Sequence, residues 1–134
     1  MATNTQTVIE IDTELRELAA SVVSRAVKAG ATAAEAVVRE GSEFSTVVRM
    51  GEVETLKESG SRAIGLRTFL GRRAASTYSS DFSAEGIQRL ISSAIELARV
   101  TSEDIYSGIP EPDQLGSLQG DLKLYHDDVY SLPP

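Results

Sequence analysis

The side chains that could carry out hydrolytic chemistry are few in this chain of 134 residues. There is no cysteine and a single histidine, His126, which is followed by Asp127 and Asp128. A zinc site needs three or four donors that converge on one ion, and three adjacent residues rarely face the same point. We therefore interpret His126 as a solvated histidine. The helical motifs of metal-assisted hydrolysis, H-E-x-x-H and H-E-x-x-x-H, do not occur in the sequence.

Other groups with catalytic potential lack the partners they would need. The serines near the middle of the chain are Ser76, Ser79, Ser80 and Ser83. Serine catalysis requires a base to activate the hydroxyl, but there is no second histidine and no G-x-S-x-G motif. The carboxylate pairs Glu103-Asp104 and Asp127-Asp128 could act in acid–base catalysis, but they lie in acidic segments typical of a solvated surface. The sequence thus predicts no catalytic, cofactor-binding or metal-ligating residue.

Four arginines lie close together in the sequence, at Arg62, Arg67, Arg72 and Arg73. They could bind an anionic ligand, a peptide carboxylate or a nucleic acid. They could equally keep a hairpin tip soluble by pairing with nearby acidic residues, and we favour this second interpretation. Gly60, Gly65 and Gly71 do not form a phosphate-binding pattern, so we assign them to turns and close packing.

The charge balance excludes several classes of partner. A net charge of −7 argues against nucleic acids and against anionic membrane surfaces, both of which select clustered positive charge. No apolar run approaches the ~20 residues of a membrane helix, and the first residues do not resemble a secretion signal. The length fits one domain, and the composition is ordinary for a globular protein. We expect an acidic, cytoplasmic domain with no direct nucleic-acid or membrane contact.

Two stretches have the apolar period of an amphipathic helix. The first runs from Asp12, a candidate N-cap, to a stop near Gly30. Its apolar residues are Leu15, Leu18, Ala19, Val22, Val23, Ala26 and Val27. The second follows Asp81 or Ser83 as the cap, and it accepts Gly86 at a cost of ~1 kcal/mol relative to alanine. Its apolar residues are Ile87, Leu90, Ile91, Ala94, Ile95 and Ala98.

Between these helices, alternation of side-chain types predicts about five short strands. They cover residues 34–39, 44–50, 53–58, 64–70 and 74–79. The turn signals between them are Gly41-Ser42, Gly51-Glu52, Ser59-Gly60-Ser61 and Gly71-Arg72. Short connections indicate antiparallel pairing. The predicted fold is α+β, an antiparallel meander in the order α-β-β-β-β-β-α with both helices on one face and an irregular tail.

Some predicted strands carry small or apolar residues on both faces. We expect the face away from the helices to be covered by a partner or by another part of a longer protein. An exposed strand edge could also take up an extended peptide, or it could be a charged and protected edge.

We divide the chain into a flexible N-terminal arm at residues 1–11, an α/β domain at residues 12–102 and an extended acidic tail at residues 103–134. The tail ends on Pro133-Pro134, and proline suits the first turn of a helix. We therefore expect the tail to lead into a C-terminal domain that is missing from this sequence.

Several segments, taken in order, resemble the N-terminal domain of the TldD/PmbA family. Gly30–Val38 resembles the GA-x-x-AEV segment after the first helix of the family, and Val48–Glu54 resembles its R-x-GEVE hairpin. The other matching segments are Ala63–Arg67, Gly71-Arg72, Ala75–Thr77, Ile95–Arg99 and Leu124-Tyr125. The likeness runs from about Leu15 to Tyr130 and is stronger to the PmbA (TldE) branch. Ala74 departs from it, because many relatives have glycine there.

The resemblance implies a protein about three times longer, concerned with peptide processing and proteolysis. In this family the TldD-type member resembles a zinc metallopeptidase with an H-E-x-x-x-H helix downstream, and the PmbA-type member pairs with it. The resemblance therefore implies a non-catalytic domain that contributes to a homo- or heterodimer and to a chamber for peptide or unfolded protein. Zinc would belong to the missing C-terminal part. The older family label, modulator of DNA gyrase, implies no DNA-binding fold. The alternatives are a free-standing protein- or peptide-interaction module and a small-ligand regulatory domain.

Overall fold

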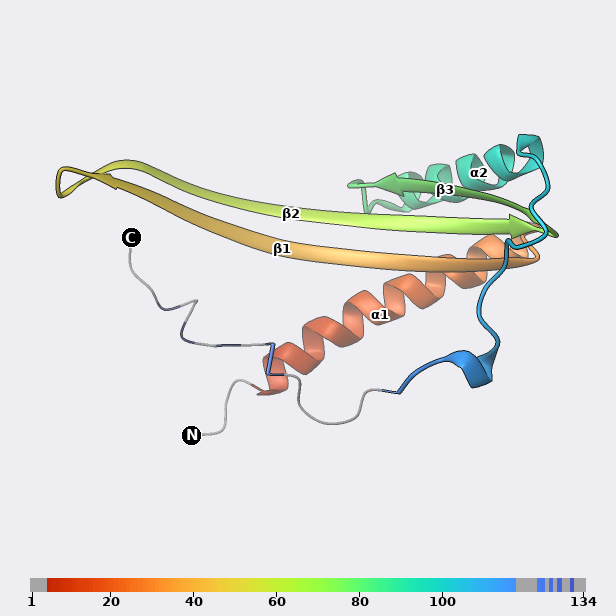
Figure 1. Ribbon diagram of the computed structural model, residues 1–134, viewed down its shortest axis with the longest axis horizontal. Coiled ribbons are helices and arrows are strands. Elements are labelled where there is room, and N and C mark those ends of the chain that lie inside the picture. Colours follow the sequence, from red (N-terminus) through yellow and green to blue (C-terminus); the bar gives the residue numbers. More distant parts are fainter. Residues whose placement is uncertain (1–4, 118–122, 125, 127, 129–130, 132–134) are drawn as a thin grey trace. The chain divides into compact units, whose positions relative to one another are not determined.

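A computed structural model describes residues 5–117, together with residues 123, 124, 126, 128 and 131. The elements are α1 (Thr5–Lys28), β1 (Ala33–Arg49), β2 (Glu52–Leu70), β3 (Arg73–Ser79), α2 (Ala84–Val100) and η1 (Pro112–Gln114). Figure 1 shows how the helices and strands of the described residues follow one another, with an extended segment after α2 that contains the 3₁₀ helix η1. The prediction of a helix start at Pro133-Pro134 concerns residues outside the described part of the chain.

The three strands form one sheet in the order β1-β2-β3. β2 and β3 are antiparallel, with Ile64 opposite Ser79 at one end of the ladder and Leu70 opposite Arg73 at the other. The α+β class and the antiparallel sheet are therefore confirmed. The prediction of five strands is wrong, because β1 joins the predicted strands 34–39 and 44–50, and β2 joins 53–58 and 64–70.

Two glycines caused this error, because glycine signals a turn only where the backbone uses its conformational freedom. The described glycines with a positive φ are Gly30, Gly51 and Gly71. Gly41 and Gly60 lie inside β1 and β2 instead, and both strands pass through them. The sequence alone does not separate these two uses of glycine.

The turn between β1 and β2 consists of Met50 and Gly51. Their φ angles are 54° and 82°, and positive φ at both central residues is characteristic of a type I′ hairpin turn. Gly71, with φ 61°, lies in the turn between β2 and β3. The turns predicted at Gly51-Glu52 and Gly71-Arg72 are thus confirmed to within a residue.

α1 begins at Thr5, so Asp12 lies inside the helix and the prediction that Asp12 caps it is wrong. The segment that we expected to form an arm, residues 1–11, thus contributes to this helix from Thr5 onward. The predicted C-terminal stop is confirmed. α1 ends at Lys28, and Gly30 follows with φ 114°, the left-handed conformation that commonly terminates helices.

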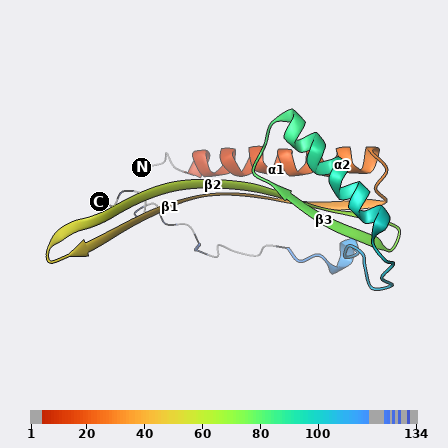
Figure 2. The ribbon, with the colours of Figure 1, turned by 90° about the horizontal axis from the view of Figure 1, so that it is seen from above.

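The core draws on both helices and on β2, and Figure 2 shows the two helices on the same side of the sheet. Its fully buried members are Val22, Ala26, Ile64, Leu66, Ile87, Leu90, Ile91, Ala94 and Ile95. Ala34, Ala36 and Val38 of β1 pack against this cluster. Alanines at the contact allow helix backbones to approach closely, while the larger side chains of β2 and α2 fill the space between the layers.

The packing divides the chain into two compact units. The described residues up to 41, together with residues 61–109, form the first unit, which contains the core. Residues 42–60 and the described residues from 110 onward form the second. We refer to residues 42–60, the end of the β1–β2 hairpin, as the arm. This segment is distinct from the N-terminal arm predicted at residues 1–11.

Candidate docking site

The face of the sheet opposite the core is built by alternation along β2. Ile64 and Leu66 point into the core. Because alternate residues of a strand face opposite sides of the sheet, the positions of Gly65 and Arg67 face away from the core. The antiparallel register places Tyr78 opposite Gly65 and Ser76 opposite Arg67. Directly opposed residues share a face, so β3 contributes these two side chains.

β1 completes this surface with Glu35 and Val37. We call the set Glu35, Val37, Gly65, Arg67, Ser76 and Tyr78 the open face. It surrounds a shallow depression of about 380 Å³, whose wall also includes Leu66 and Thr77. The depression exists because Gly65 has no side chain, and the flanking Val37 and Tyr78 are 69% and 87% exposed. A large exposed aromatic ring beside a hollow is typical of a binding surface.

Arg67 is neutralised on the open face by Glu35, because its Nε lies 2.6 Å from Glu35 Oε1. Its guanidinium also lies over the ring of Phe69, 5.1 Å from the centroid, and Phe69 itself is buried. Both members of the ion pair are nearly half exposed, so the pair contributes little to stability. Its effect is to fix the direction of Arg67. The open face therefore presents apolar, hydroxyl and balanced charged groups, which suit a polypeptide surface better than a phosphate.

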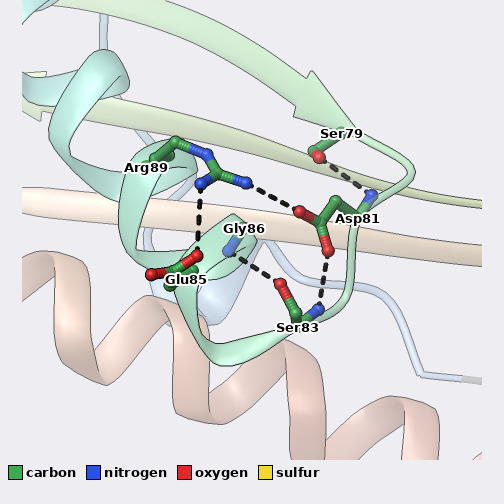
Figure 3. Close-up of polar contacts among 6 residues, drawn as sticks. All are labelled: Ser79, Asp81, Ser83, Glu85, Gly86 and Arg89. Carbon is green, nitrogen blue, oxygen red and sulfur yellow. Dashed lines mark hydrogen bonds and ion pairs between the residues drawn. The ribbon is translucent and has the colours of Figure 1, made fainter.

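A second group of polar residues lies at the start of α2 (Figure 3). Ser83 is the N-cap, and its Oγ accepts a hydrogen bond from Gly86 N at 3.1 Å. Asp81 Oδ1 accepts from Ser83 N at 3.0 Å, and Arg89 donates to Asp81 Oδ2 at 2.8 Å. Of the two candidate caps, Ser83 is the one confirmed, and Asp81 supports it from the preceding loop.

The hydrogen bonds from Ser83 to Asp81, assisted by Arg89, lower the pKa of the Asp81 carboxyl from its ordinary value. Both carboxylate oxygens of Asp81 accept hydrogen bonds, one from the loop backbone and one from Arg89. The lowered pKa of Asp81 therefore reflects helix capping. Nothing in this group has the geometry of a nucleophile and a base. We assign it a structural role.

The four arginines of the sequence analysis do not converge. Arg67 pairs with Glu35, and Arg73 pairs with Glu103, Nε to Oε1 at 3.7 Å. The remaining two have different contacts. Arg62 lies 4.7 Å from the centroid of the Phe82 ring, and Arg72 donates to the backbone oxygen of Ser107 at 3.1 Å. Pairing with nearby acids is thus confirmed for two of them, and the structure brings no anion site together from the four.

The serines and carboxylates are likewise dispersed. Ser79 Oγ accepts from Asp81 N at 3.0 Å, Ser83 caps α2, and Asp104 Oδ1 accepts from Tyr106 N at 2.9 Å. Ser76 alone belongs to the open face, and Ser80 is exposed.

His126 and Asp128 are both exposed, and Asp127 lies outside the described residues. Among the residues that the structure describes, no three of histidine, cysteine, aspartate and glutamate are grouped to hold a metal ion.

Sequence reasoning missed Glu35, Val37 and Tyr78 as members of one surface. The signal was present in the strand alternation, since residues of one parity on each strand pack into the core and the other parity must face away. It could not be used without the register, which the sequence does not supply.

Comparison with known proteins places these features in a family. Residues 34–98 match the family model described as PmbA/TldA metallopeptidase domain 1. The chain is 32% identical to a metalloprotease PmbA homologue of Haemophilus influenzae over 113 residues, which is 84% of this chain and 25% of that protein. It is 29% identical to the metalloprotease PmbA of Escherichia coli O157:H7 over 118 residues, 88% of this chain and 26% of that protein.

A solved structure of a candidate modulator of DNA gyrase from Bacteroides thetaiotaomicron has the same fold. Its TM-score is 0.80 at 23% identity, and the match covers 90% of this chain and 28% of that one. This chain thus spans about a quarter of the length of the relatives that it matches. No helix in the described part of the chain is long and apolar enough to cross a membrane. The matched segments include the β1–β2 hairpin and the three-stranded sheet with α2, and the chain belongs to the PmbA/TldD family.

Proposed function

We propose that this chain acts as a docking domain in a peptide-processing protein of the PmbA/TldD type, and that it contributes no catalytic group. Its role is to help assemble a homo- or heterodimer of such subunits and to form part of the wall of a peptide chamber. The hydrolytic groups, and any zinc, belong to the part of such a protein that this chain does not match. Two relatives named as metalloproteases support the link to proteolysis.

The observation that carries the docking role is the open face. The core occupies one side of the sheet, while Val37 and Tyr78 remain exposed on the other beside the hollow above Gly65. Exposed apolar surface beside a depression is stabilised when another polypeptide covers it. The balanced Glu35–Arg67 pair allows this contact without burial of an unpaired charge.

The catalytic part of the proposal is tested with the purified chain. It is dialysed, analysed for metal, and incubated with unfolded protein and fluorogenic peptides, with zinc and with a chelator. We expect no chelator-sensitive hydrolysis. One tightly held zinc per chain, or hydrolysis that the chelator stops, would overturn the proposal.

The docking part is tested by mixing the chain with a TldD-type subunit and following complex formation by native mass spectrometry. Val37→Glu and Tyr78→Glu each place a carboxylate on the open face and should abolish the complex. Ser93→Ala, on the exposed side of α2, is the matched control and should have no effect. A complex unaffected by both open-face substitutions would exclude this surface as the interface.

The second candidate is a free-standing interaction module that binds peptide or protein on the same face. The exposure of Tyr78 favours it equally. Binding of unfolded peptide to the chain alone, with no affinity for a TldD-type subunit, would select this alternative.

A further inference from the structure

The arm has an unpaired strand edge. β1 and β2 are neighbours in the sheet, but β3 pairs with β2 only from Ile64 to Leu70. Among the described residues, the arm segment of β2 therefore has a strand neighbour on one side only. Backbone N–H and C=O groups in such an edge can form a ladder with an added strand.

The hairpin turn determines which residues offer these groups. In a two-residue hairpin, the residues that flank the turn, here Arg49 and Glu52, bond to each other across the two strands. Backbone groups alternate in direction along a strand, so the N–H and C=O groups of Glu54 also point toward β1. Val53, Thr55 and Lys57 then direct their N–H and C=O groups to the unpaired edge. An added strand would bond to these three residues.

The side chains along this edge specify the chemistry of the added strand. Arg49 contacts Glu54, NH1 to Oε1 at 3.3 Å, which places both on one face of the arm. By alternation, Glu52 and Glu58 of β2 share that face. Neither has an ion-pair partner within the described residues, while Glu54 has Arg49. Cross-strand neighbours of opposite charge stabilise a sheet, so basic residues are favoured opposite Glu52 and Glu58.

The opposite face of the arm carries three exposed apolar residues beside Thr46, Thr55 and Lys57. Phe44, Val48 and Val53 lie there by the same alternation, and they are 47%, 62% and 54% exposed. An added strand with apolar residues on this face would extend the apolar surface and remove part of it from water. A two-stranded ribbon is marginally stable in water, and a third strand with an apolar face stabilises it.

We propose that the edge of β2 at Val53, Thr55 and Lys57 binds an extended polypeptide segment in which basic and apolar residues alternate. The bound segment becomes a third strand of the arm. Its basic residues face Glu52 and Glu58, and its apolar residues lie beside Val53. This site is separate from the open face, and its test does not depend on hydrolysis or on a second subunit.

The test uses capped, fluorescently labelled peptides of about eight residues, a usual strand length. One alternates lysine and valine, a second alternates glutamate and valine, and a third is the lysine peptide with every backbone amide N-methylated. Fluorescence anisotropy measures the affinity of the purified chain for each. We expect binding of the lysine peptide and at least about tenfold weaker binding of the other two, which corresponds to ~1.4 kcal/mol.

Two protein variants locate the site. Thr55→Pro removes the N–H that faces the edge and leaves the β1 ladder intact, since proline is tolerated where the N–H points away from the sheet. It should weaken binding at least about tenfold, whereas Thr55→Val should bind within about twofold of the original chain. Glu52→Lys with Glu58→Lys should reverse the preference between the lysine and glutamate peptides.

Amide hydrogen exchange shows which groups the peptide covers. We expect new protection at Val53, Thr55 and Lys57 when the lysine peptide is added, and unchanged protection of Glu54. Three results would each overturn the proposal. They are equal binding of the N-methylated peptide, full binding by Thr55→Pro with the hairpin amides still protected, and protection on β1 in place of β2.

Discussion

Thr32 is bonded twice to the backbone oxygen of Phe69. Its amide N donates at 2.8 Å and its Oγ1 donates at 2.9 Å to the same atom. Oγ1 also accepts from Gly71 N at 3.0 Å. A single side chain in the connection between α1 and β1 thus fixes the start of the hairpin to the far end of β2 and to the turn that follows it.

Thr32→Ala should therefore destabilise the chain by about 1–2 kcal/mol, since two hydrogen bonds to the hydroxyl are lost. Chemical denaturation measures the loss. Thr32→Ser keeps the hydroxyl and should retain most of the stability. Equal losses in both variants would mean that the methyl group, rather than the hydroxyl, makes the contribution.

Gly86→Ala should destabilise the chain, although alanine is the better helix former by ~1 kcal/mol. A Cβ at this position would lie 2.5 Å from the backbone oxygen of Asp81. The loop that holds Asp81 would have to move and would lose its bonds to Ser83 and Arg89. Thermal denaturation should show a lower Tm for Gly86→Ala and an equal or higher Tm for Ser93→Ala, an exposed position in the same helix. A raised Tm for Gly86→Ala would show that the loop adjusts freely.

The Asp81 carboxyl gives the stability of the chain a component that depends on pH. Hydrogen bonds from Ser83, with the nearby charge of Arg89, hold its pKa in the folded chain below the ordinary value of 3.8. The folded state thus favours the ionised form, and this contribution is present above pH 3.8 and is lost as the pH falls through the lowered pKa. Asp81→Asn should have a shallower fall in stability below pH 4 than the original chain. Parallel curves for the two proteins would contradict this assignment.

Met50 occupies a left-handed conformation, with φ 54°, and its side chain is almost fully exposed. Residues other than glycine, asparagine and aspartate adopt this region at a cost of roughly 1 kcal/mol. Met50→Asn should increase amide protection in the arm, because asparagine followed by glycine is a preferred type I′ pair. Gly51→Ala should decrease it, since φ is 82° there. Protection that falls in both variants would show that the Met50 side chain itself stabilises the turn.

Thr68 is fully buried, and its hydroxyl has no hydrogen-bond partner among the described residues. Thr68→Val has nearly the same shape and removes an unpaired polar group from the core. We expect it to stabilise the chain by about 1 kcal/mol in chemical denaturation. Thr77→Val is the comparison, because Thr77 Oγ1 donates to the backbone oxygen of Leu90 and this variant should lose stability.

Elements with a strong local signal could be predicted from the sequence. α2 has a serine cap, a regular apolar stripe and a β-strand before it, and Ser83 and Ile87 behave as predicted. The strand count failed because Gly41 and Gly60 carry the same local signal as Gly51 and Gly71, and only pairing with a neighbouring strand keeps them extended.

The residues of the open face could not be predicted from the sequence for a related reason. Glu35, Arg67 and Tyr78 lie on three strands, and their proximity depends on register. The sequence did indicate that one sheet face would need a cover, because the small and apolar residues on both faces of the strands were visible.

The length of the β1–β2 hairpin has a consequence for how this family can change during evolution. A single inserted residue would invert the facing of every later side chain in a strand, and the core would lose its apolar partners. One residue added to each strand at the turn leaves the facing unchanged, so the hairpin end can lengthen or shorten while Ile64 and Leu66 keep their places. We expect natural relatives to differ by even numbers of residues between the positions that match Val38 and Ile64, with the flanking segments constant, and an alignment of full-length sequences can check this.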